Sequence, residues 1–288
     1  MKANSGLEKI MHRLAEYSQT ASGAKRSVAN YLATHLEEIA FFNLDQIAKS
    51  TGISASTVTR TVSEIGFKGY PGLQNEVREI VRMKLLPAER SRILSITEES
   101  QAYATSLKFD RENLEYLADL NPIEKFEQAA ALLSRARCVY LCGMQSSHGP
   151  ILTFGSFLSQ IRTGVHVISL SDMSLSEQIL EFTDQDVLMV LALPHYHAFS
   201  VGIAEDALKR GCTLISITDN AHSSLGLKSA VAFAVPYRSA SFFNSHAASC
   251  SLLSALIAGI YLANKKNSQK RLTEHEELLR KWNLYEKS

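Results

Sequence analysis

The stretch from residue 43 to residue 73 restricts the fold most, because it predicts two short helices joined by a glycine turn. Apolar residues recur at helical spacing in its first part, and Asn43 followed three residues later by Gln46 is a capping-box start. Gly52 then interrupts the pattern and suits a tight turn with positive φ. Two helices around such a turn are typical of a helix-turn-helix.

The second helix of this stretch is predicted to begin at its N-cap, Ser54, and to end at Gly66, with Val58 and Val62 facing inward. Its outer face carries short hydrogen-bonding side chains and one arginine, and no acid precedes Glu64. A helix in the major groove of DNA needs such residues, because longer ones would hold it away from the base edges. The alternative is a helical hairpin that packs inside an ordinary α-domain.

The residues expected to contact DNA follow from that outer face and from the turn after the second helix. Side chains on the helix would reach the bases, whereas Lys68 and Tyr70 beyond it would touch phosphates. Alternatively, Lys68 is solvated and Tyr70 closes the small core. The predicted DNA-binding residues are Ser54, Ser56, Thr57, Thr59, Arg60, Lys68 and Tyr70.

The run TGISASTVTRTVSEIGFKGYPGL resembles the N-terminal domain of RpiR-type bacterial transcriptional regulators. That family joins its helix-turn-helix to a C-terminal sugar isomerase (SIS) domain, so the resemblance implies an operator DNA partner and a second, α/β domain. The positions that carry the resemblance are Ile53-Ser54, Ser56-Thr57-Val58, Arg60, Ile65-Gly66-Phe67, Gly69-Tyr70 and Leu73.

Length and charge agree with two domains. A chain of 288 residues favours two cores over one. Residues 1–86 hold 11 Lys+Arg and 8 Asp+Glu, a net charge of +3, and the remaining 19 and 21 give −2, which together make the overall +1. The weak excess of positive charge in the first part agrees with a nucleic-acid partner. Without a membrane-length apolar run, a leader or a CxxC pair, the four cysteines indicate reduced thiols in a cytoplasmic protein.

The rest of the chain predicts an α/β domain. Five short apolar runs alternate with helical segments, and this alternation is typical of βαβ units and a parallel sheet. We therefore predict an all-α helix-turn-helix domain in residues 1–86, a polar, partly helical linker in 87–106, a SIS-like domain with a five-stranded parallel sheet flanked by helices in 107–265, and a helical tail in 266–288. The apolar runs are residues 138–142, 165–169, 186–193, 213–218 and 231–235.

Ligands of such a sheet lie at its carboxyl edge, where loops follow strands. The loop after the first strand, G-M-Q-S-S-H-G, places small residues and serines before a helix, a combination suited to an anion. It resembles the SIS G-x-G-x-S loop that cradles a sugar phosphate, with Gly143 and Ser147 matching and Gln145 replacing the second glycine.

Two further loops complete the predicted effector site. After the third strand, Pro194, Tyr196 and Ser200 resemble a variant of the family's phosphate loop, and Ala192 stands where a serine is usual. Thr218 with Ser223 and Ser224 resembles the family's next loop, although these residues also fit an ordinary turn. The predicted ligand-binding residues are Gln145, Ser146, Ser147, His195, Tyr196, His197, Thr218, Ser223 and Ser224.

Several alternatives remain open from the sequence. The loop histidines His148, His195, His197, His222 and His246 suit a zinc or copper site, but each also fits an ordinary loop. A working phosphosugar isomerase needs a positioned base, and a SIS domain that serves only for oligomerisation needs no ligand. We expect a non-enzymatic regulator without metal or cofactor, forming a homodimer or homotetramer and sensing a small anionic metabolite such as a sugar phosphate.

Overall fold

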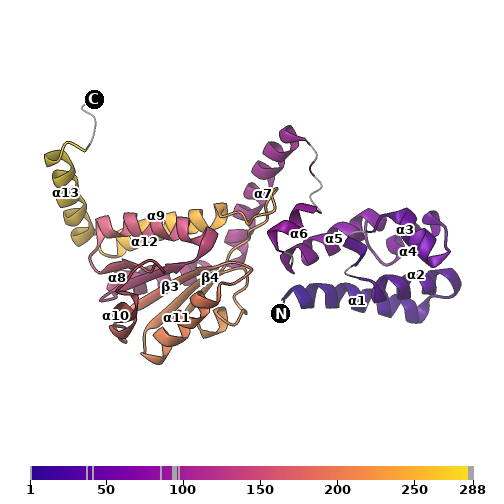
Figure 1. Ribbon diagram of the computed structural model, residues 1–288, viewed down its shortest axis with the longest axis horizontal. Coiled ribbons are helices and arrows are strands. Elements are labelled where there is room, and N and C mark those ends of the chain that lie inside the picture. Colours follow the sequence, from indigo (N-terminus) through magenta and orange to yellow (C-terminus); the bar gives the residue numbers. More distant parts are fainter. Residues whose placement is uncertain are drawn as a thin grey trace. The chain divides into compact units, whose positions relative to one another are not determined.

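The computed structural model describes residues 2–36, 38–40, 42–84, 86–92, 96 and 98–284. The chain forms two compact units, Met1–Ser95 and Ile96–Ser288 (Figure 1). Each unit has its own buried hydrophobic core. The division after Ser95 falls inside the segment predicted as a linker, because Pro87–Arg92 is a helix of the first unit and the second unit's first helix begins at Glu99.

The first unit is entirely helical in its described part. Leu14, Leu32 and Val62 are completely buried in a core to which every helix from α1 to α5 contributes. Its elements are α1 (Lys2–Thr20), α2 (Gly23–Thr34), η1 (Glu38–Ala40), α3 (Leu44–Thr51), α4 (Ala55–Glu64), α5 (Gly69–Lys84) and α6 (Pro87–Arg92).

The predicted helix-turn-helix is confirmed by helices α3 and α4 and by their caps. The Asn43 side chain accepts from the Gln46 backbone N–H at 2.8 Å, and the Gln46 side chain accepts from the Asn43 N–H at 2.7 Å. Gly52 ends α3 in the left-handed region with φ 67°, and its N–H donates to the Ala48 carbonyl. The Ser54 hydroxyl caps α4 by accepting from the Thr57 N–H at 3.3 Å.

Replacing Gly52 with valine should destabilise this turn through the backbone alone. A Cβ at Gly52 would meet nothing within 4 Å, so the cost comes from holding a β-branched residue at φ 67°. We expect a loss of about 1–3 kcal/mol, seen as faster native-state hydrogen exchange in α3 and α4 of the full-length chain. Gly52→Asn is the matched control, because asparagine tolerates the left-handed region. Equal exchange in the two variants would contradict this account.

The second unit carries the predicted five-stranded parallel sheet, with strand order β2-β1-β3-β4-β5. All five strands therefore end at the same edge. The strands are β1 (Val139–Gly143), β2 (Val165–Val167), β3 (Val187–Ala192), β4 (Thr213–Thr218) and β5 (Val231–Ala234), and the other elements are α7 (Glu99–Leu120), α8 (Ile123–Arg135), η2 (Gln145–Ser147), α9 (His148–Ile161), α10 (Leu175–Leu180), α11 (Ala198–Lys209), η3 (Gly226–Lys228), α12 (Ala247–Ala263) and α13 (Lys265–Lys281).

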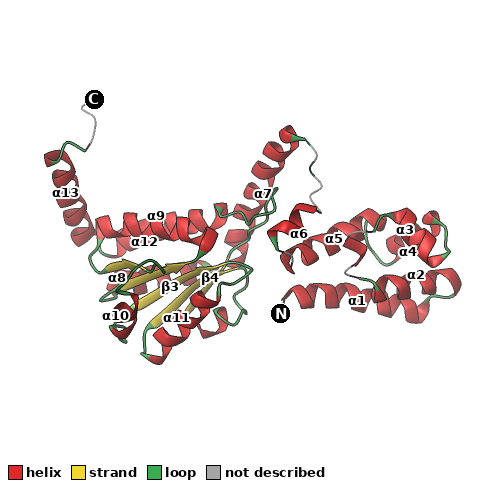
Figure 2. Ribbon diagram, in the orientation of Figure 1, coloured by secondary structure: helices red, strands yellow, loops and turns green. Residues whose placement is uncertain are grey.

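Helices cover both faces of this sheet (Figure 2). Alternate strand residues such as Leu141 and Met189 pack with α8, α9 and α12 on one face. Their neighbours Tyr140 and Leu188 pack with α10 and α11 on the other face. Burial on both faces explains why the strands read as continuous apolar runs rather than alternating ones.

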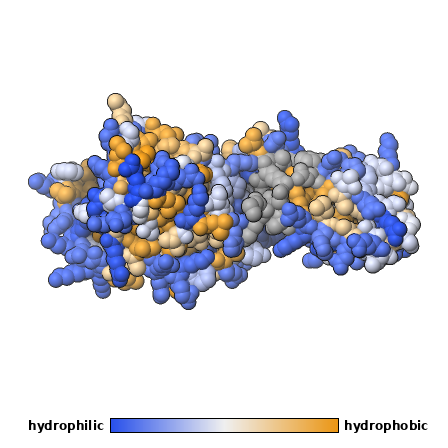
Figure 3. Space-filling view, turned by 90° about the horizontal axis from the view of Figure 1, so that it is seen from below, coloured by the Kyte–Doolittle hydropathy of each residue, from blue (hydrophilic) through white to orange (hydrophobic). Residues whose placement is uncertain are grey.

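No single described helix is long and apolar enough to cross a membrane. Helices α12 and α13 meet that requirement only as a pair, and the chain bends by 111° between them. Helix α12 buries Leu253 and Leu256 in the core of the sheet domain. On the face of the molecule shown in Figure 3, hydrophobic residues interrupt the hydrophilic surface most extensively over the second unit.

Candidate DNA-binding face and effector site

Helix α4 presents a polar face to solvent and an apolar face to the core. Val58 and Val62 are completely buried, whereas Ser54, Ser56 and Arg60 are exposed and Thr57 and Thr59 are half-buried. The hydroxyl of Ser54 lies 3.0 Å from that of Ser56 and 2.9 Å from that of Thr57, so the first turn of α4 carries a cluster of hydroxyl groups. These side chains occupy the face on which the sequence places DNA contacts.

The structure corrects the predicted phosphate contact of Tyr70. Only 2% of this side chain is exposed, and its hydroxyl donates to the Phe42 carbonyl at 2.7 Å. Burial raises the pKa of Tyr70 to about 12, so the phenol stays protonated. Tyr70 therefore closes the core of the first unit, whereas Lys68 remains exposed and accessible to a phosphate.

Glu64, the acid at the end of α4, is tied to two other helices. Both of its carboxylate oxygens lie 2.8 Å from Lys25 Nζ on α2, and the Tyr17 hydroxyl on α1 donates to it at 2.5 Å. The hydrogen bonds from Lys25 and then Tyr17 lower the pKa of Glu64, and the same contact raises the pKa of Tyr17 to about 12. The negative charge nearest to the polar face of α4 is therefore paired, although the sequence alone did not reveal this pairing.

The loop after β1 is a short η2 turn that leads into α9. Within it, Ser147 is 5% exposed, whereas Gln145 and Ser146 are exposed. Gln145 has φ 52°, a left-handed conformation that favours glycine. The SIS pattern that this loop resembles has its second glycine at this position, whereas this chain adopts the left-handed conformation with a glutamine.

His246, at the start of α12, connects the β1 loop to the segment that follows β5. Its Nε2 lies 3.1 Å from the Ser146 hydroxyl, and its buried Nδ1 has no hydrogen-bond partner among the described residues. Burial lowers the pKa of His246, so the neutral imidazole is favoured. The sequence placed His246 beside the carboxyl edge only as one of several loop histidines, and its pairing with Ser146 became visible in the structure.

A second cluster lies where β3 and β4 end. The Tyr196 hydroxyl hydrogen-bonds to Asp219, and Thr218 Oγ1 lies 3.0 Å from the Tyr196 oxygen. Burial, followed by the bond to Asp219, raises the pKa of Tyr196 to about 12. Ser223 also hydrogen-bonds to Tyr196, and its hydroxyl accepts from the Gly226 N–H at 3.0 Å. The structure thus brings together three of the predicted ligand-binding residues: Tyr196, Thr218 and Ser223.

The remaining predicted residues differ in how accessible they are. His197 Nδ1 accepts from the Phe199 N–H at 3.3 Å and so caps α11, which leaves Nε2 as its available nitrogen. His195 and Ser224 are exposed. Across the carboxyl edge, Asn244 donates to the Pro194 carbonyl at 2.6 Å and thereby joins the loops after β5 and β3.

Two further features bear on the chemistry of this unit. Among the described residues, no group of three His, Cys, Asp or Glu side chains could hold a metal ion. A cavity of about 190 Å³ lies between α9 and α12, its lining includes no residue of either polar cluster, and its walls are mostly apolar. An anion would gain nothing from such walls. Its lining residues are Pro150, Thr153, Phe154, Phe157, Cys250, Leu253, Ser254 and Ile257.

Comparisons with known proteins match both units. Residues 6–82 match the helix-turn-helix domain of the rpiR family, and residues 132–259 match the SIS domain. A protein of Haemophilus influenzae described as an uncharacterized HTH-type transcriptional regulator is 21% identical over 226 residues, which cover 74% of this chain and 75% of that protein.

Two solved structures share the fold. The sugar isomerase domain of an RpiR transcription factor from Sphaerobacter thermophilus is 19% identical, with a TM-score of 0.58, and the match covers 62% of this chain and 99% of that one. The Vibrio vulnificus NanR protein complexed with ManNAc-6P is 17% identical, with a TM-score of 0.57, and the match covers 95% of this chain and 98% of that one.

Proposed function

The chain is a transcriptional regulator of the RpiR family with a SIS domain, and from this we propose that α4 reads operator DNA while the carboxyl edge of the sheet senses a sugar phosphate or a related anion. Such a protein works in the cytoplasm, where operators and phosphorylated sugars are both present. Effector binding would change operator affinity, because the effector and the DNA then favour different states of one protein.

The observation that carries the effector proposal is the bond between Ser146 and His246. It joins the start of α12 to the β1 loop, which leads directly into the N-terminus of α9, and backbone N–H groups and the helix dipole favour an anion at such an N-terminus. The buried Nδ1 of His246 leaves one more polar group at this place to be satisfied. The likeness to NanR, which was solved with ManNAc-6P, supports a phosphorylated sugar as the class of effector.

Thermal shift of the full-length protein tests this proposal. Each sugar phosphate in a panel, ManNAc-6P included, is paired with its unphosphorylated sugar, and a ligand present at 100 times its Kd should stabilise the protein by about 2.7 kcal/mol. Stabilisation by the phosphorylated member alone supports an anion site. Equal stabilisation by the neutral sugar would refute it.

Arg60→Ala should weaken operator binding without changing the fold, because Arg60 is exposed on the polar face of α4. If its guanidinium contacts a guanine edge, we expect a loss of about 1–3 kcal/mol confined to one base position. An operator obtained by selection from random DNA and fluorescence anisotropy on its single-base variants would measure this. Lys68→Ala is the comparison, since a lost phosphate contact weakens all sequences alike. Unchanged binding by folded Arg60→Ala would remove this residue from the interface.

The isomerase alternative needs a base beside the substrate. In the second cluster the available acid, Asp219, accepts hydrogen bonds from Tyr196 and Thr218, an arrangement that suits a fixed acceptor better than a proton shuttle. We therefore propose binding without turnover. The test is to incubate the protein with any sugar phosphate that stabilises it and to analyse the mixture for the isomeric sugar phosphate. Formation of the isomer would show that the protein is an isomerase.

We further propose that the chain acts as a homodimer or homotetramer. Helices α9 and α12 leave large apolar side chains in solvent, with Leu152, Phe157 and Leu262 each more than half exposed. Exposed apolar surface of this kind is typical of protein interfaces. A monomeric mass by sedimentation at micromolar concentration would contradict it. A SIS domain that serves only for assembly would give an oligomer in which no sugar phosphate raises the melting temperature.

A further inference from the structure

Helix α7 is bonded to the loop between β5 and α12, residues 235–246, at several points far apart in sequence. Asn113 Nδ2 donates to the Arg238 carbonyl at 2.7 Å, and the Arg238 N–H donates to Asn113 Oδ1 at 3.2 Å. One turn earlier, Asp110 accepts from the Ser245 hydroxyl at 2.5 Å. The amide of Asn113 thus pairs with the backbone of this loop as a neighbouring strand would.

The contact between Asn113 and the β5–α12 loop is buried, so it constrains the structure of the loop. Asn113 is only 2% exposed, so breaking its pair would leave a buried amide unsatisfied. The Arg238 guanidinium lies 3.8 Å from the centre of the Phe109 ring and 3.1 Å from the Glu112 carboxylate, both on α7. The conformation of the loop therefore depends on four residues of α7, namely Phe109, Asp110, Glu112 and Asn113.

The same loop carries contacts of the effector site. Asn244 donates to the Pro194 carbonyl, and His246 meets Ser146 in the β1 loop. Between these two residues stands Ser245, whose hydroxyl donates to Asp110 and accepts from the Ala247 N–H at 3.2 Å. A single short run of residues thus touches α7 on one side and the β1 and β3 loops on the other.

We propose that Asp110 and Asn113 are positioning residues of the effector site, and that α7 registers the state of the β5–α12 loop. The inference rests on the proposed function in one respect, namely that the effector binds beside Ser146 and His246. Helix α7 is the first helix after the segment that connects the two units in sequence. When an effector contacts the loop, the populations of the conformations of α7 shift, and this shift reaches the DNA-binding unit through the segment that joins it to α7.

Hydrogen exchange on the full-length protein without any sugar phosphate tests whether α7 positions the β5–α12 loop. Asp110→Ala is compared with Asp119→Ala, an exposed acid on the same helix, because both substitutions change the helix propensity of α7 equally. We expect amides of residues 245–250 to exchange about fivefold faster in Asp110→Ala alone, the effect of one lost hydrogen bond on local opening. Equal exchange of these amides in the two variants would overturn the positioning role.

A substitution in the effector site tests whether α7 responds to a change in the β5–α12 loop. Ser146→Ala removes the partner of His246, and we expect exchange in residues 107–113 of α7 to rise about twofold to fivefold. Ser169→Ala is the matched control, since the Ser169 hydroxyl lies at the same sheet edge and bonds within its own loop, 2.8 Å from Ser171 Oγ. If α7 exchanges identically in both variants, the helix does not register the loop.

Binding of ManNAc-6P separates this inference from the proposed function. If the probe stabilises the wild type, Asp110→Ala should weaken its binding about fivefold, whereas Asp119→Ala should leave the affinity intact. Unaltered affinity in Asp110→Ala would refute the positioning role while effector sensing stands. If no sugar phosphate binds the wild type, the proposal that the protein senses a sugar phosphate is refuted. The two exchange experiments still decide whether α7 and the loop are coupled.

Discussion

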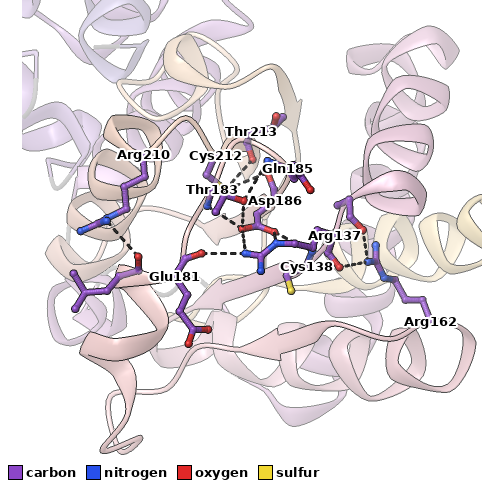
Figure 4. Close-up of polar contacts among 12 residues, drawn as sticks. Arg137, Cys138, Arg162, Glu181, Thr183, Gln185, Asp186, Arg210, Cys212 and Thr213 are labelled. Atoms are coloured by element: carbon purple, nitrogen blue, oxygen red, sulfur yellow. Dashed lines mark hydrogen bonds and ion pairs between the residues drawn. The ribbon is translucent and has the colours of Figure 1, made fainter.

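Asp186→Ala should lower the free energy of unfolding of the second unit by about 3 kcal/mol, because it leaves buried hydrogen-bond donors without an acceptor. Its carboxylate is 1% exposed and lies where α8 leads into β1 and where β3 begins (Figure 4). Arg137 donates to both oxygens, at 3.0 and 2.6 Å, while the Cys138 N–H at 3.0 Å and the Thr183 N–H at 2.9 Å also donate. Alanine would leave these donors without an acceptor, although Arg137 can still reach water.

Urea denaturation monitored by circular dichroism measures this loss. Asp184→Ala is the matched control, because Asp184 belongs to the same loop and is exposed. We expect the control to unfold like the wild type and Asp186→Ala to unfold at a clearly lower urea concentration. Coincident unfolding curves for the two variants would show that the Asp186 cluster does not hold the sheet together.

The same cluster predicts a dependence of stability on pH. Burial alone would raise the pKa of Asp186, but hydrogen bonds from Arg137, Thr183 and Cys138 outweigh it and lower the pKa. Because the folded value lies below the unfolded value of about 3.9, the stabilisation is present above that pH and is lost as pH falls through the folded pKa. Below pH 4 the wild type should therefore lose more stability than Asp186→Asn, whose amide does not titrate.

Gly143→Ala should destabilise the second unit by about 3 kcal/mol and disturb the effector site. A Cβ on Gly143 would lie 2.6 Å from the Ser147 carbonyl oxygen and 2.8 Å from Ile151 Cγ1. The carbonyl belongs to the backbone of the turn into α9, so it cannot move without displacing the loop, and overpacking of this kind costs about 1–3 kcal/mol. Thermal unfolding and the thermal shift with sugar phosphates measure the two effects.

Gly149→Ala provides the control for that experiment. Gly149 stands at the start of the same helix, and a Cβ there would meet nothing within 4 Å. We expect this variant to be at least as stable as the wild type, because alanine favours a helix over glycine. If Gly143→Ala matched it in stability and in ligand-induced shift, close packing of the β1 loop against α9 would not be what requires glycine.

The helix-turn-helix was predictable because its determinants are local. The capping pair Asn43 and Gln46 is three residues apart, and Gly52 fixes the turn through its own φ. The five parallel strands were predictable for a related reason, since each is an apolar run between helices and burial on both faces imposes that pattern. The loops that we propose to bind the effector were placed at the ends of these strands for the same reason.

The errors arose where a side chain's partner lies far away in sequence. Tyr70 was predicted to contact a phosphate, but its hydroxyl donates to the carbonyl of Phe42, 28 residues earlier in the chain. The predicted linker, residues 87–106 and partly helical, includes α6 and the start of α7, which begins at Glu99. His246 was named only among the loop histidines, because its partner, Ser146, is 100 residues away in sequence.

The amino-acid sequence by itself determined where helices and strands form, that the chain has two units, and which strand ends meet at one edge. Those properties depend on capping, backbone preference and apolar periodicity, which act within a few residues. Tertiary structure alone decided which polar groups are free to meet a ligand or DNA. A hydroxyl, an amide or an imidazole becomes structural or available according to the partner that folding places within about 3 Å of it, and Tyr70, Asn113 and His246 each acquired that partner from a distant part of the chain.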